Sequence, residues 1–382
     1  MHAPHSRPLR ILHVVRAPVG GLFRHICDLA AGQTERGHAV GLIADSSTGG
    51  ERAANTLARL APRLALGIYR LPIARDLGPS DLIGLARMFR TIRAIGPDVL
   101  HGHGAKGGAC ARLAPAGPAT IRVYTPHGGS LHYAPGTLRG RIYGNIERFL
   151  MPRTDLFLFE SAYARSTYAA QVGAPKGIVR VVHNGVGEED FAPISHVMDA
   201  TDLVFVGELR KLKGVDVLLA ALALLRGQGR RVTLTVVGEG PDANAFHAEA
   251  SRLGLDDTVR FLGYRGAREA FGLGRILMVP SRNESLPYVV LEATAAGIPI
   301  IPTNVGGIPE IFGPYAHRLV PPGDATALAA AIAAALDDPQ GTLAAATALR
   351  ARVRQLFSLD AMVAGVLDAY REALTARFLT AK

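Results

Sequence analysis

Short apolar runs alternate along this chain with longer segments in which apolar residues recur every three or four positions. In the first half, the short runs lie at residues 9–15, 39–44, 98–101, 120–126, 155–161 and 178–184. Runs rich in Val, Ile and Leu that are separated by amphipathic segments are typical of parallel strands joined by crossover helices. The pattern therefore predicts an α/β domain with a parallel sheet in this half of the chain.

The segment after the first run has a helical period. Its apolar positions share one face of a predicted helix over residues 22–37, and they are Leu22, Phe23, Ile26, Cys27, Leu29 and Ala30. Gly37 follows the last turn and is a natural C-terminal stop, because glycine adopts the left-handed backbone that ends many helices.

The periodicity is lost between residues 185 and 200, where acidic residues and a proline gather as they do in interdomain linkers. It then restarts, with predicted strands at residues 202–207, 231–238, 258–263, 276–280 and 298–302, and helices near 214–226, 241–253, 287–296, 324–337, 341–356 and 359–378. We therefore predict two doubly wound, Rossmann-like α/β domains, over residues 1–190 and 191–358, and a C-terminal helix over 359–382. We expect the domains to face each other across a cleft, with ligands at the carboxyl ends of their strands.

Composition supports a soluble protein of two domains. The chain has 382 residues, of which 48% are apolar and 19% charged, enough for two buried cores and too few charges for a disordered chain. Its two cysteines, Cys27 and Cys110, exclude a disulfide scaffold and a zinc ribbon. No apolar run is long enough for a membrane helix or a secretory signal. We therefore expect a cytoplasmic location.

The net charge of +10 is distributed unevenly. Of the 42 basic and 32 acidic residues, 23 and 13 lie in residues 1–190, so the excess positive charge belongs to the first half. An anionic partner is one explanation, and a basic surface without a partner is the other. Nucleic acid is disfavoured, because the chain has no lysine-rich arm and no basic stripe interleaved with aromatic residues. A phosphorylated acceptor and an anionic membrane surface remain as candidate partners.

The densest candidate motif spans residues 280–310. Seven residues separate Glu284 from Glu292, and Pro287 between them is placed to open a helix that contains Glu292. Backbone N–H groups at the start of that helix, over residues 285–288, would form a phosphate site. Carboxylates on either side could accept hydrogen bonds from ribose and sugar hydroxyls, so the motif suits a nucleotide sugar. Two glutamates at this spacing are also common as surface charge.

Neither domain has the dinucleotide-binding fingerprint. The turn after the first predicted strand has the sequence RAPVGGLFRH, and the turn after the first strand of the second domain has GELRKLKG. Because both lack the G-x-G-x-x-G spacing, an NAD-dependent dehydrogenase is disfavoured.

The 280–310 motif resembles the E-x7-E signature of glycosyltransferase family four, a family of retaining enzymes with the two-domain GT-B fold. Further motifs agree in order and spacing, and they are Gly20-Gly21, DVLHGHGAKGG at 98–108, TPHGG at 125–129, HNGV at 183–186, VGELRKLKGVD at 206–216 and VGEGP at 237–241. In such enzymes the final helix crosses back to the first domain.

The resemblance implies roles for individual residues. It assigns donor binding to Gly20, Gly21, Arg210, Lys213, Glu284, Ser285, Leu286, Pro287 and Glu292, catalysis to His127, Glu284 and Lys213, and acceptor binding to His103 and Lys106. Lys213 would hold the donor diphosphate, Glu292 the ribose, and Glu284 with His127 the transferred sugar. Glu208 stands where the family has an arginine, and whether Arg210 replaces that arginine stays open.

Without the resemblance, several of these residues have a purely structural explanation as well. Gly20 and Gly21 also suit a plain tight turn, His127 a histidine that faces the core, and Arg210 a solvated loop cation. No Asp-x-Asp occurs, and the histidines show no metal-ligand spacing, so we expect no metal and no cofactor. The charge on the leaving group would then be neutralised by Lys213, a nearby arginine and helix N-termini.

The expected function is that of a retaining glycosyltransferase. By resemblance, it would move a sugar from a UDP- or GDP-sugar to an acceptor on the N-terminal domain, by same-face attack through a short-lived oxocarbenium ion pair. The basic first half favours a lipid-linked saccharide acceptor in cell-surface or exopolysaccharide synthesis, with peripheral contact to the inner face of a membrane. The alternatives are a nucleotide-sugar epimerase of the same fold and a catalytically silent nucleotide-sugar-binding subunit.

Overall fold

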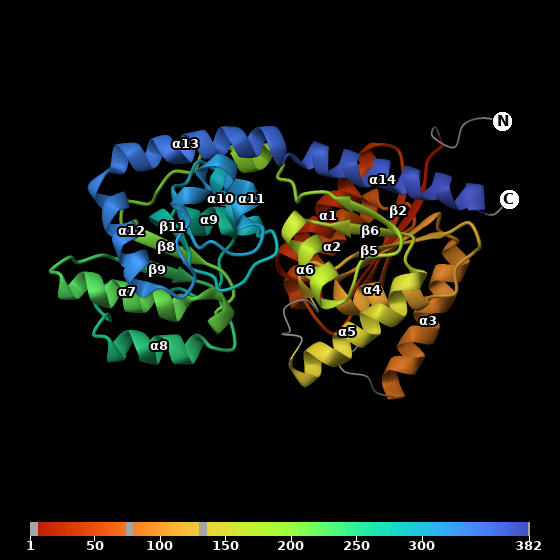
Figure 1. Cartoon of the computed structure of the whole chain (residues 1–382), viewed down its shortest axis with the longest axis horizontal. Coiled ribbons are helices and arrows are strands. Elements are labelled where there is room, and N and C mark those ends of the chain that lie inside the picture. The colour runs from red at the N-terminus through yellow and green to blue at the C-terminus, as the bar shows by residue number, and fades with distance from the viewer. Residues whose placement is uncertain (1–6, 74–78, 130–135, 381–382) are drawn as a thin grey trace. The chain divides into compact units, whose positions relative to one another are not determined.

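The computed structural model describes residues 7–73, 79–129 and 136–380. The chain divides into two compact units (Figure 1), which are Met1–Gly185 with Leu359–Lys382, and Val186–Ser358. We call them the first unit and the second unit. Among the described residues, no helix has both the length and the apolar character needed to cross a membrane.

The first unit is built on a parallel sheet of seven strands in the order β3-β2-β1-β4-β5-β6-β7. The strands are β1 Arg10–Val15, β2 Ala39–Asp45, β3 Ile68–Leu71, β4 Val99–His103, β5 Ile121–Thr125, β6 Leu156–Phe159 and β7 Ile178–Val181. The helices are α1 Gly20–Glu35, α2 Gly50–Leu60, α3 Pro79–Ile95, α4 Gly104–Leu113, α5 Leu138–Leu150, α6 Ala162–Gln171 and α14 Leu359–Thr380.

Two helical layers cover this sheet. Helices α1 and α14 share a core with one face, and α3 and α4 pack on the opposite face (Figure 1). Gly32 of α1 lies so close to Val363 of α14 that an added Cβ would come within 2.6 Å of the valine side chain. The last helix is therefore part of the first unit, although the second unit separates the two in sequence.

The second unit is built on a parallel sheet of five strands in the order β10-β9-β8-β11-β12. The strands are β8 Thr201–Val206, β9 Leu234–Val237, β10 Val259–Phe261, β11 Gly274–Val279 and β12 Ile300–Pro302. The helices are α7 Val215–Gly227, α8 Ala243–Arg252, α9 Ala267–Phe271, α10 Tyr288–Ala295, α11 Ile308–Phe312, α12 Ala325–Asp337 and α13 Pro339–Leu356.

The segment after residue 185, expected to be a linker, belongs instead to the second unit. The backbone N–H of Val186 donates to the carbonyl of Phe357 at 2.9 Å, and Phe191 is buried. The boundary between the units therefore follows Gly185 rather than residue 190.

Each sheet has one point at which the strand order reverses. In the first unit β1 lies between β2 and β4, and in the second unit β8 lies between β9 and β11. Helices that leave neighbouring strands in opposite directions open a crevice at the carboxyl ends of the strands there, which is where open α/β sheets bind ligands. We therefore expect a binding site at the loops that follow β1, β4, β8 and β11.

Close backbone packing joins the loops that follow β8 and β11. Gly214 has φ +74°, and an added Cβ would lie 1.9 Å from the carbonyl oxygen of Pro280. Glycine is required at this position for its left-handed backbone and for the close approach.

We predict that Gly214→Ala lowers the free energy of unfolding by about 3 kcal/mol, because it adds steric overlap to the cost of a left-handed alanine. Gly227→Ala is the matched control, since a Cβ there meets nothing within 4 Å. Urea unfolding of the two variants measures the difference. Equal stability would show that the loops move apart without cost.

Candidate functional site

Three loops of the second unit are joined at the carboxyl edge of its sheet. Arg282, after β11, donates its backbone N–H to the carbonyl of Leu212 at 2.8 Å. Its guanidinium donates to the Lys211 carbonyl at 2.7 Å and pairs with both carboxylate oxygens of Asp216 at 2.7 and 2.8 Å. An added Cβ at Gly240, after β9, would lie 2.4 Å from the Leu209 carbonyl oxygen. These contacts fix the backbone that presents the predicted site residues.

Lys213 and Glu284 meet at this edge. Lys213 Nζ donates to Glu284 Oε1 at 2.6 Å, and Ser281 Oγ donates to the same oxygen at 2.7 Å. The Glu284 side chain is only 9% exposed and that of Lys213 is 26% exposed. Both bonds use Oε1, and in the described part of the chain Oε2 has no hydrogen-bond partner. The pair therefore presents an ammonium and a carboxylate oxygen side by side.

The N-terminus of α10 follows this pair directly. Pro287 is the N-cap residue and no side chain caps the helix. Ser285 accepts a hydrogen bond from Gly307 N at 2.6 Å, and an added Cβ at Gly306 would lie 2.0 Å from the Glu284 carbonyl oxygen. The loop after β12 thus supports the turn that contains Ser285 and Leu286. An uncapped helix N-terminus beside an ammonium favours an anionic ligand.

The remaining donor residues predicted in the second unit are Glu292 and Arg210. Glu292 is partly buried at the start of the second turn of α10. Arg210 lies 3.4 Å from Glu208, and both side chains are 48% exposed. The arginine therefore lies beside the carboxylate that stands at the position of the family's arginine.

The reversal point of the first unit has two helix N-termini without side-chain caps, those of α1 and α4. Gly20 opens α1 with φ +62°, and both Gly20 and Gly21 are exposed. An added Cβ at Gly107 of α4 would lie 2.6 Å from the Val14 carbonyl oxygen, so α4 packs tightly on β1. Lys106 is partly buried in the first turn of α4.

Five histidines converge between these helix N-termini. They come from β1, α1, β4 and the loop after β5, and they are His13, His25, His101, His103 and His127. Spacing along the sequence does not reveal this set, because the five histidines are scattered along the chain. The pairing of the strands brings three of them together. His13 of β1 lies beside His101 of β4, and His103 lies two positions further along the same face of the sheet.

Three of these histidines and a glutamine form a hydrogen-bonded series, which we call the histidine chain. His13 Nε2 lies 2.9 Å from Gln33 Oε1, and His13 Nδ1 lies 2.9 Å from His103 Nε2. His103 Nδ1 lies 3.0 Å from His127 Nε2. His101 bonds elsewhere, with Nδ1 2.6 Å from the Tyr370 hydroxyl of α14.

As they lie in this structure, the linked imidazoles have hydrogen-bond spacing. Groups of three histidines, His13-His101-His103 and His25-His103-His127, lie close enough to hold an ion. Two nitrogens bound to one tetrahedral zinc at about 2.05 Å would lie about 3.3 Å apart. The observed 2.9 and 3.0 Å are instead ordinary hydrogen-bond lengths.

Burial keeps the histidine cluster neutral. It lowers the pKa of His13 and His25 to about 4, and repulsion from His13 adds to the effect at His25. Burial also places the pKa of His101, His103 and His127 well below the usual range, with repulsion between neighbouring imidazoles as the second cause. Neutral imidazoles both donate and accept hydrogen bonds, as sugar hydroxyls require.

His127 has an unusual backbone. Its φ is +52°, and among the described residues no other non-glycine residue has a positive φ. Gly128 follows with φ +74°, and Gly129 lies against the N-terminus of α4. A left-handed histidine costs about 1 kcal/mol or more, and such strain is found mainly at functional sites. His127 is also partly exposed, so it is accessible to a ligand.

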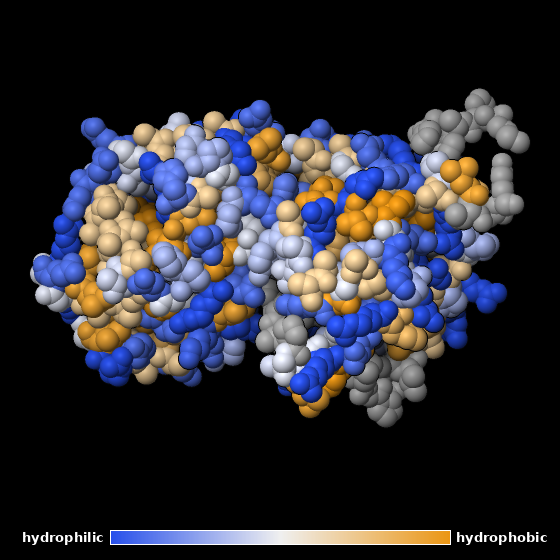
Figure 2. All heavy atoms as spheres, in the orientation of Figure 1, coloured by the Kyte–Doolittle hydropathy of each residue, from blue (hydrophilic) through white to orange (hydrophobic). Residues whose placement is uncertain are grey.

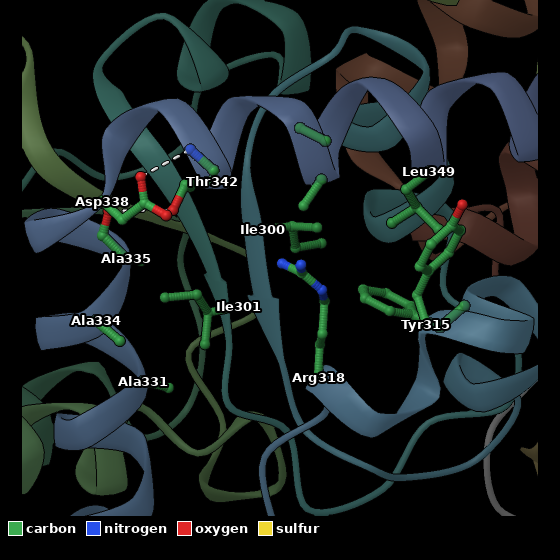
Figure 3. Close-up of a pocket in the computed structure, with 14 residues that line it drawn as sticks. Ile300, Ile301, Tyr315, Arg318, Ala331, Ala334, Ala335, Asp338, Thr342 and Leu349 are labelled. Atoms are coloured by element: carbon green, nitrogen blue, oxygen red, sulfur yellow. Dashed lines mark hydrogen bonds between the residues drawn. The ribbon is translucent and has the colours of Figure 1, made fainter.

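A cavity of about 300 Å³ lies elsewhere in the second unit, between β12, α12 and α13 (Figure 3). Alanines of the two helices leave the space open, and the Arg318 side chain points into it. Its lining includes neither Lys213 nor Glu284 nor Glu292. The cavity is therefore separate from the site at the carboxyl edge.

Comparisons with known proteins match both halves of the chain. The profile of the family described as Glycosyl transferases group 1 matches residues 187–355, and that of Glycosyltransferase Family 4 matches residues 19–190. The glycogen synthase of Mycobacterium tuberculosis is 25% identical over 383 residues, covering 93% of this chain and 92% of that protein.

Solved structures share the fold. Sucrose-phosphate synthase of Thermosynechococcus elongatus superposes with a TM-score of 0.78 and 22% identity, over 97% of this chain and 100% of that one. HepE of Anabaena, in complex with UDP and glucose, superposes with a TM-score of 0.77 and 19% identity, over 94% and 98% of the two chains.

The neutral cluster makes the protein sensitive to acid. The histidine pKa is about 6.5 in an unfolded chain. Between pH 6.5 and 4 the unfolded state therefore binds more protons than the folded state, and the stability falls as the pH is lowered. From pH 7 to 5 we predict a loss of about 2 kcal/mol for each of His13 and His25, given their folded pKa of about 4. Calorimetric unfolding at both pH values measures it.

The variant His13→Asn should show a shallower pH dependence, and His317→Gln, which removes an exposed histidine, should keep that of the natural chain. Equal stability of the natural chain at pH 7 and pH 5 would contradict the neutral cluster.

Proposed function

Because this chain belongs to glycosyltransferase family 4 and has the GT-B fold, we propose that it transfers a sugar from a UDP- or GDP-sugar to an acceptor with retention of configuration. The family and the fold are those predicted from the sequence. The observation that supports this donor class is the contact between Lys213 and Glu284 beside the N-terminus of α10.

The donor diphosphate lies against Lys213 and the N-terminal amides of α10 in this proposal. Phosphate oxygens replace Glu284 as the partner of the Lys213 ammonium, and the released carboxylate accepts hydrogen bonds from sugar hydroxyls. Glu292 accepts hydrogen bonds from the ribose hydroxyls. Arg210 supplies further positive charge once it turns from Glu208.

The transfer step follows from these roles. The bond between the anomeric carbon and the diphosphate oxygen breaks, and a bond from the acceptor oxygen to that carbon forms on the same face. The departing phosphate takes the proton of the acceptor hydroxyl. Lys213, Arg210 and the α10 N-terminus stabilise the negative charge on the leaving group without a metal ion. His127 contacts the transferred sugar, as the resemblance implies.

The pairing of Glu208 with Arg210 favours one alternative, a nucleotide-sugar-binding subunit without activity. In that case the carboxylate keeps the arginine from the diphosphate. Incubation with a panel of isotopically marked UDP- and GDP-sugars separates the cases. Slow hydrolysis with retained configuration supports transfer, inversion at C2 supports an epimerase, and binding without turnover supports the silent subunit.

We predict that Lys213→Ala lowers the rate of donor turnover by about 10²-fold, comparable with loss of another group that stabilises transition-state charge. Lys211→Ala is the matched control, because it removes an exposed lysine two residues away. It should turn over the donor at nearly the natural rate. A Lys213→Ala protein with undiminished turnover would overturn the proposed role of Lys213.

Helix α5 supports the proposed contact of the first unit with an anionic membrane. Its outward residues Leu138, Ile142, Ile146 and Phe149 are 76%, 49%, 39% and 60% exposed. Their spacing of four, four and three residues places them on one stripe of the helix. Figure 2 shows hydrophobic and hydrophilic side chains next to each other over this helix.

The opposite face of α5 is fixed by a buried ion pair. Glu147 accepts from Arg112 of α4 and from the Tyr124 hydroxyl, both at 2.8 Å. The outward stripe is flanked by Arg139 and Arg141, which form no ion pair in the part of the chain that the structure describes. An apolar stripe beside arginines suits a helix that lies in the surface of an anionic membrane.

Vesicle co-sedimentation tests this surface. We predict that the protein prefers vesicles of phosphatidylcholine with phosphatidylglycerol over phosphatidylcholine alone at low salt. The double variant Arg139→Gln/Arg141→Gln should bind about thirtyfold more weakly, because each of the two lost charges is worth about 1 kcal/mol. Arg231→Gln/Arg265→Gln, on the second unit, changes the net charge equally and should bind normally. Equal losses in both double variants would count against α5.

A further inference from the structure

The histidine chain ends at the amide oxygen of Gln33, an atom that can only accept a hydrogen bond. Gln33 in α1 and His13 in β1 are fully buried, and Gln33 Oε1 lies 2.9 Å from His13 Nε2. An amide oxygen has no proton to give. With the amide oriented as it is in the structure, His13 supplies the proton from Nε2.

The direction of every later bond follows from that one contact. A neutral imidazole has a single N–H, so His13 Nδ1 carries a lone pair and accepts from His103 Nε2 at 2.9 Å. His103 Nδ1 then carries a lone pair as well and accepts from His127 Nε2 at 3.0 Å. The proton of His127 is thereby placed on Nε2, and Nδ1 remains an acceptor.

The residues around the histidine chain preserve the direction of its hydrogen bonds. His103 is buried, and the surrounding imidazoles are held neutral as described above, so a second ring proton that would break the series is disfavoured. His101 is engaged by Tyr370 and by Thr125, with Nε2 2.8 Å from Thr125 Oγ1, and does not compete for the histidine chain. His25 packs edge-on against His127, with ring centroids 4.8 Å apart, and limits rotation of that ring.

We propose that Gln33 is a positioning residue that acts through His13 and His103 to set the tautomer of His127, with the proton on Nε2 and a lone pair on Nδ1. His127 then meets its ligand as a hydrogen-bond acceptor, which suits a hydroxyl donor. The match to a sugar hydroxyl rests on the proposed function, whereas the tautomer itself is a property of the protein without any substrate.

Nitrogen NMR of the full chain, labelled with ¹⁵N in its histidine rings, tests the tautomer directly. At pH 7 we expect His103 and His127 each to show one protonated Nε2 and one unprotonated Nδ1. Loss of a signal in His127→Asn assigns it. A proton on His127 Nδ1, or a doubly protonated His127 ring, in the natural chain would overturn the proposal whatever the activity.

Variants of Gln33 test its control of the histidine chain. Gln33→Met keeps the size of the side chain and removes the acceptor, so the Nε2–H preference of His127 should be lost. Gln33→Glu retains an acceptor oxygen and should restore it. Thr125→Val is the control, because it removes a partner of His101 only and should leave the His127 tautomer unchanged.

The kinetic readout separates positioning from folding. We expect Gln33→Met to lower kcat about tenfold, the scale of one hydrogen bond, with the KM for donor little changed, and Gln33→Glu to recover most of the loss. If the His127 tautomer is unchanged in Gln33→Met, Gln33 does not control that tautomer and the proposal is wrong. If Gln33→Met does not fold, the natural chain and Gln33→Glu still decide the tautomer. A correct tautomer in a protein without transfer activity would refute the proposed function and leave this inference standing.

Discussion

The position of β8 between β9 and β11 is the constraint on which the candidate site of the second unit depends. Since the strands are parallel, the loops after β8 and β11 end at the same edge and lie side by side. Gly214 lets one loop approach the other so closely that a side chain there would overlap the Pro280 carbonyl, and Arg282 joins the two loops by hydrogen bonds. Lys213 and Glu284, distant in sequence, become neighbours for this reason.

The two units differ in the charge of the side chains at the point where the strand order reverses. The second unit presents an ion pair and an uncapped helix N-terminus, which suit the charged part of a ligand. The first unit presents neutral imidazoles, which suit hydroxyls. A charged group left unpaired in a buried site is costly, and in the structure Glu284 and Lys213 are paired with each other.

Much of the fold could be predicted because its strands are continuous apolar runs. The run at residues 276–280, for example, corresponds to β11 at Gly274–Val279. β3 was missed because its four residues are only half buried and include an arginine. α5 was missed for a different reason, since its exposed face is apolar and obscures the usual amphipathic pattern.

The candidate site was predictable only in part. The spacing of Glu284, Glu292 and Pro287 indicated a loop followed by a helix, which the structure has. The histidine chain could not be found from spacing, because Gln33, His13 and His103 come from three elements and act only through their register and packing. The pairing of Arg210 with Glu208 likewise depends on a loop conformation that no local pattern specifies.

A crystal structure of the chain with bound UDP or GDP, whichever raises the melting temperature more, would show whether Lys213 and α10 hold the nucleotide. We predict diphosphate oxygens within hydrogen-bond distance of Lys213 Nζ and the first amides of α10, with the ribose hydroxyls at Glu292. A nucleotide bound elsewhere, such as in the cavity beside Arg318, with Lys213 still paired to Glu284, would contradict it.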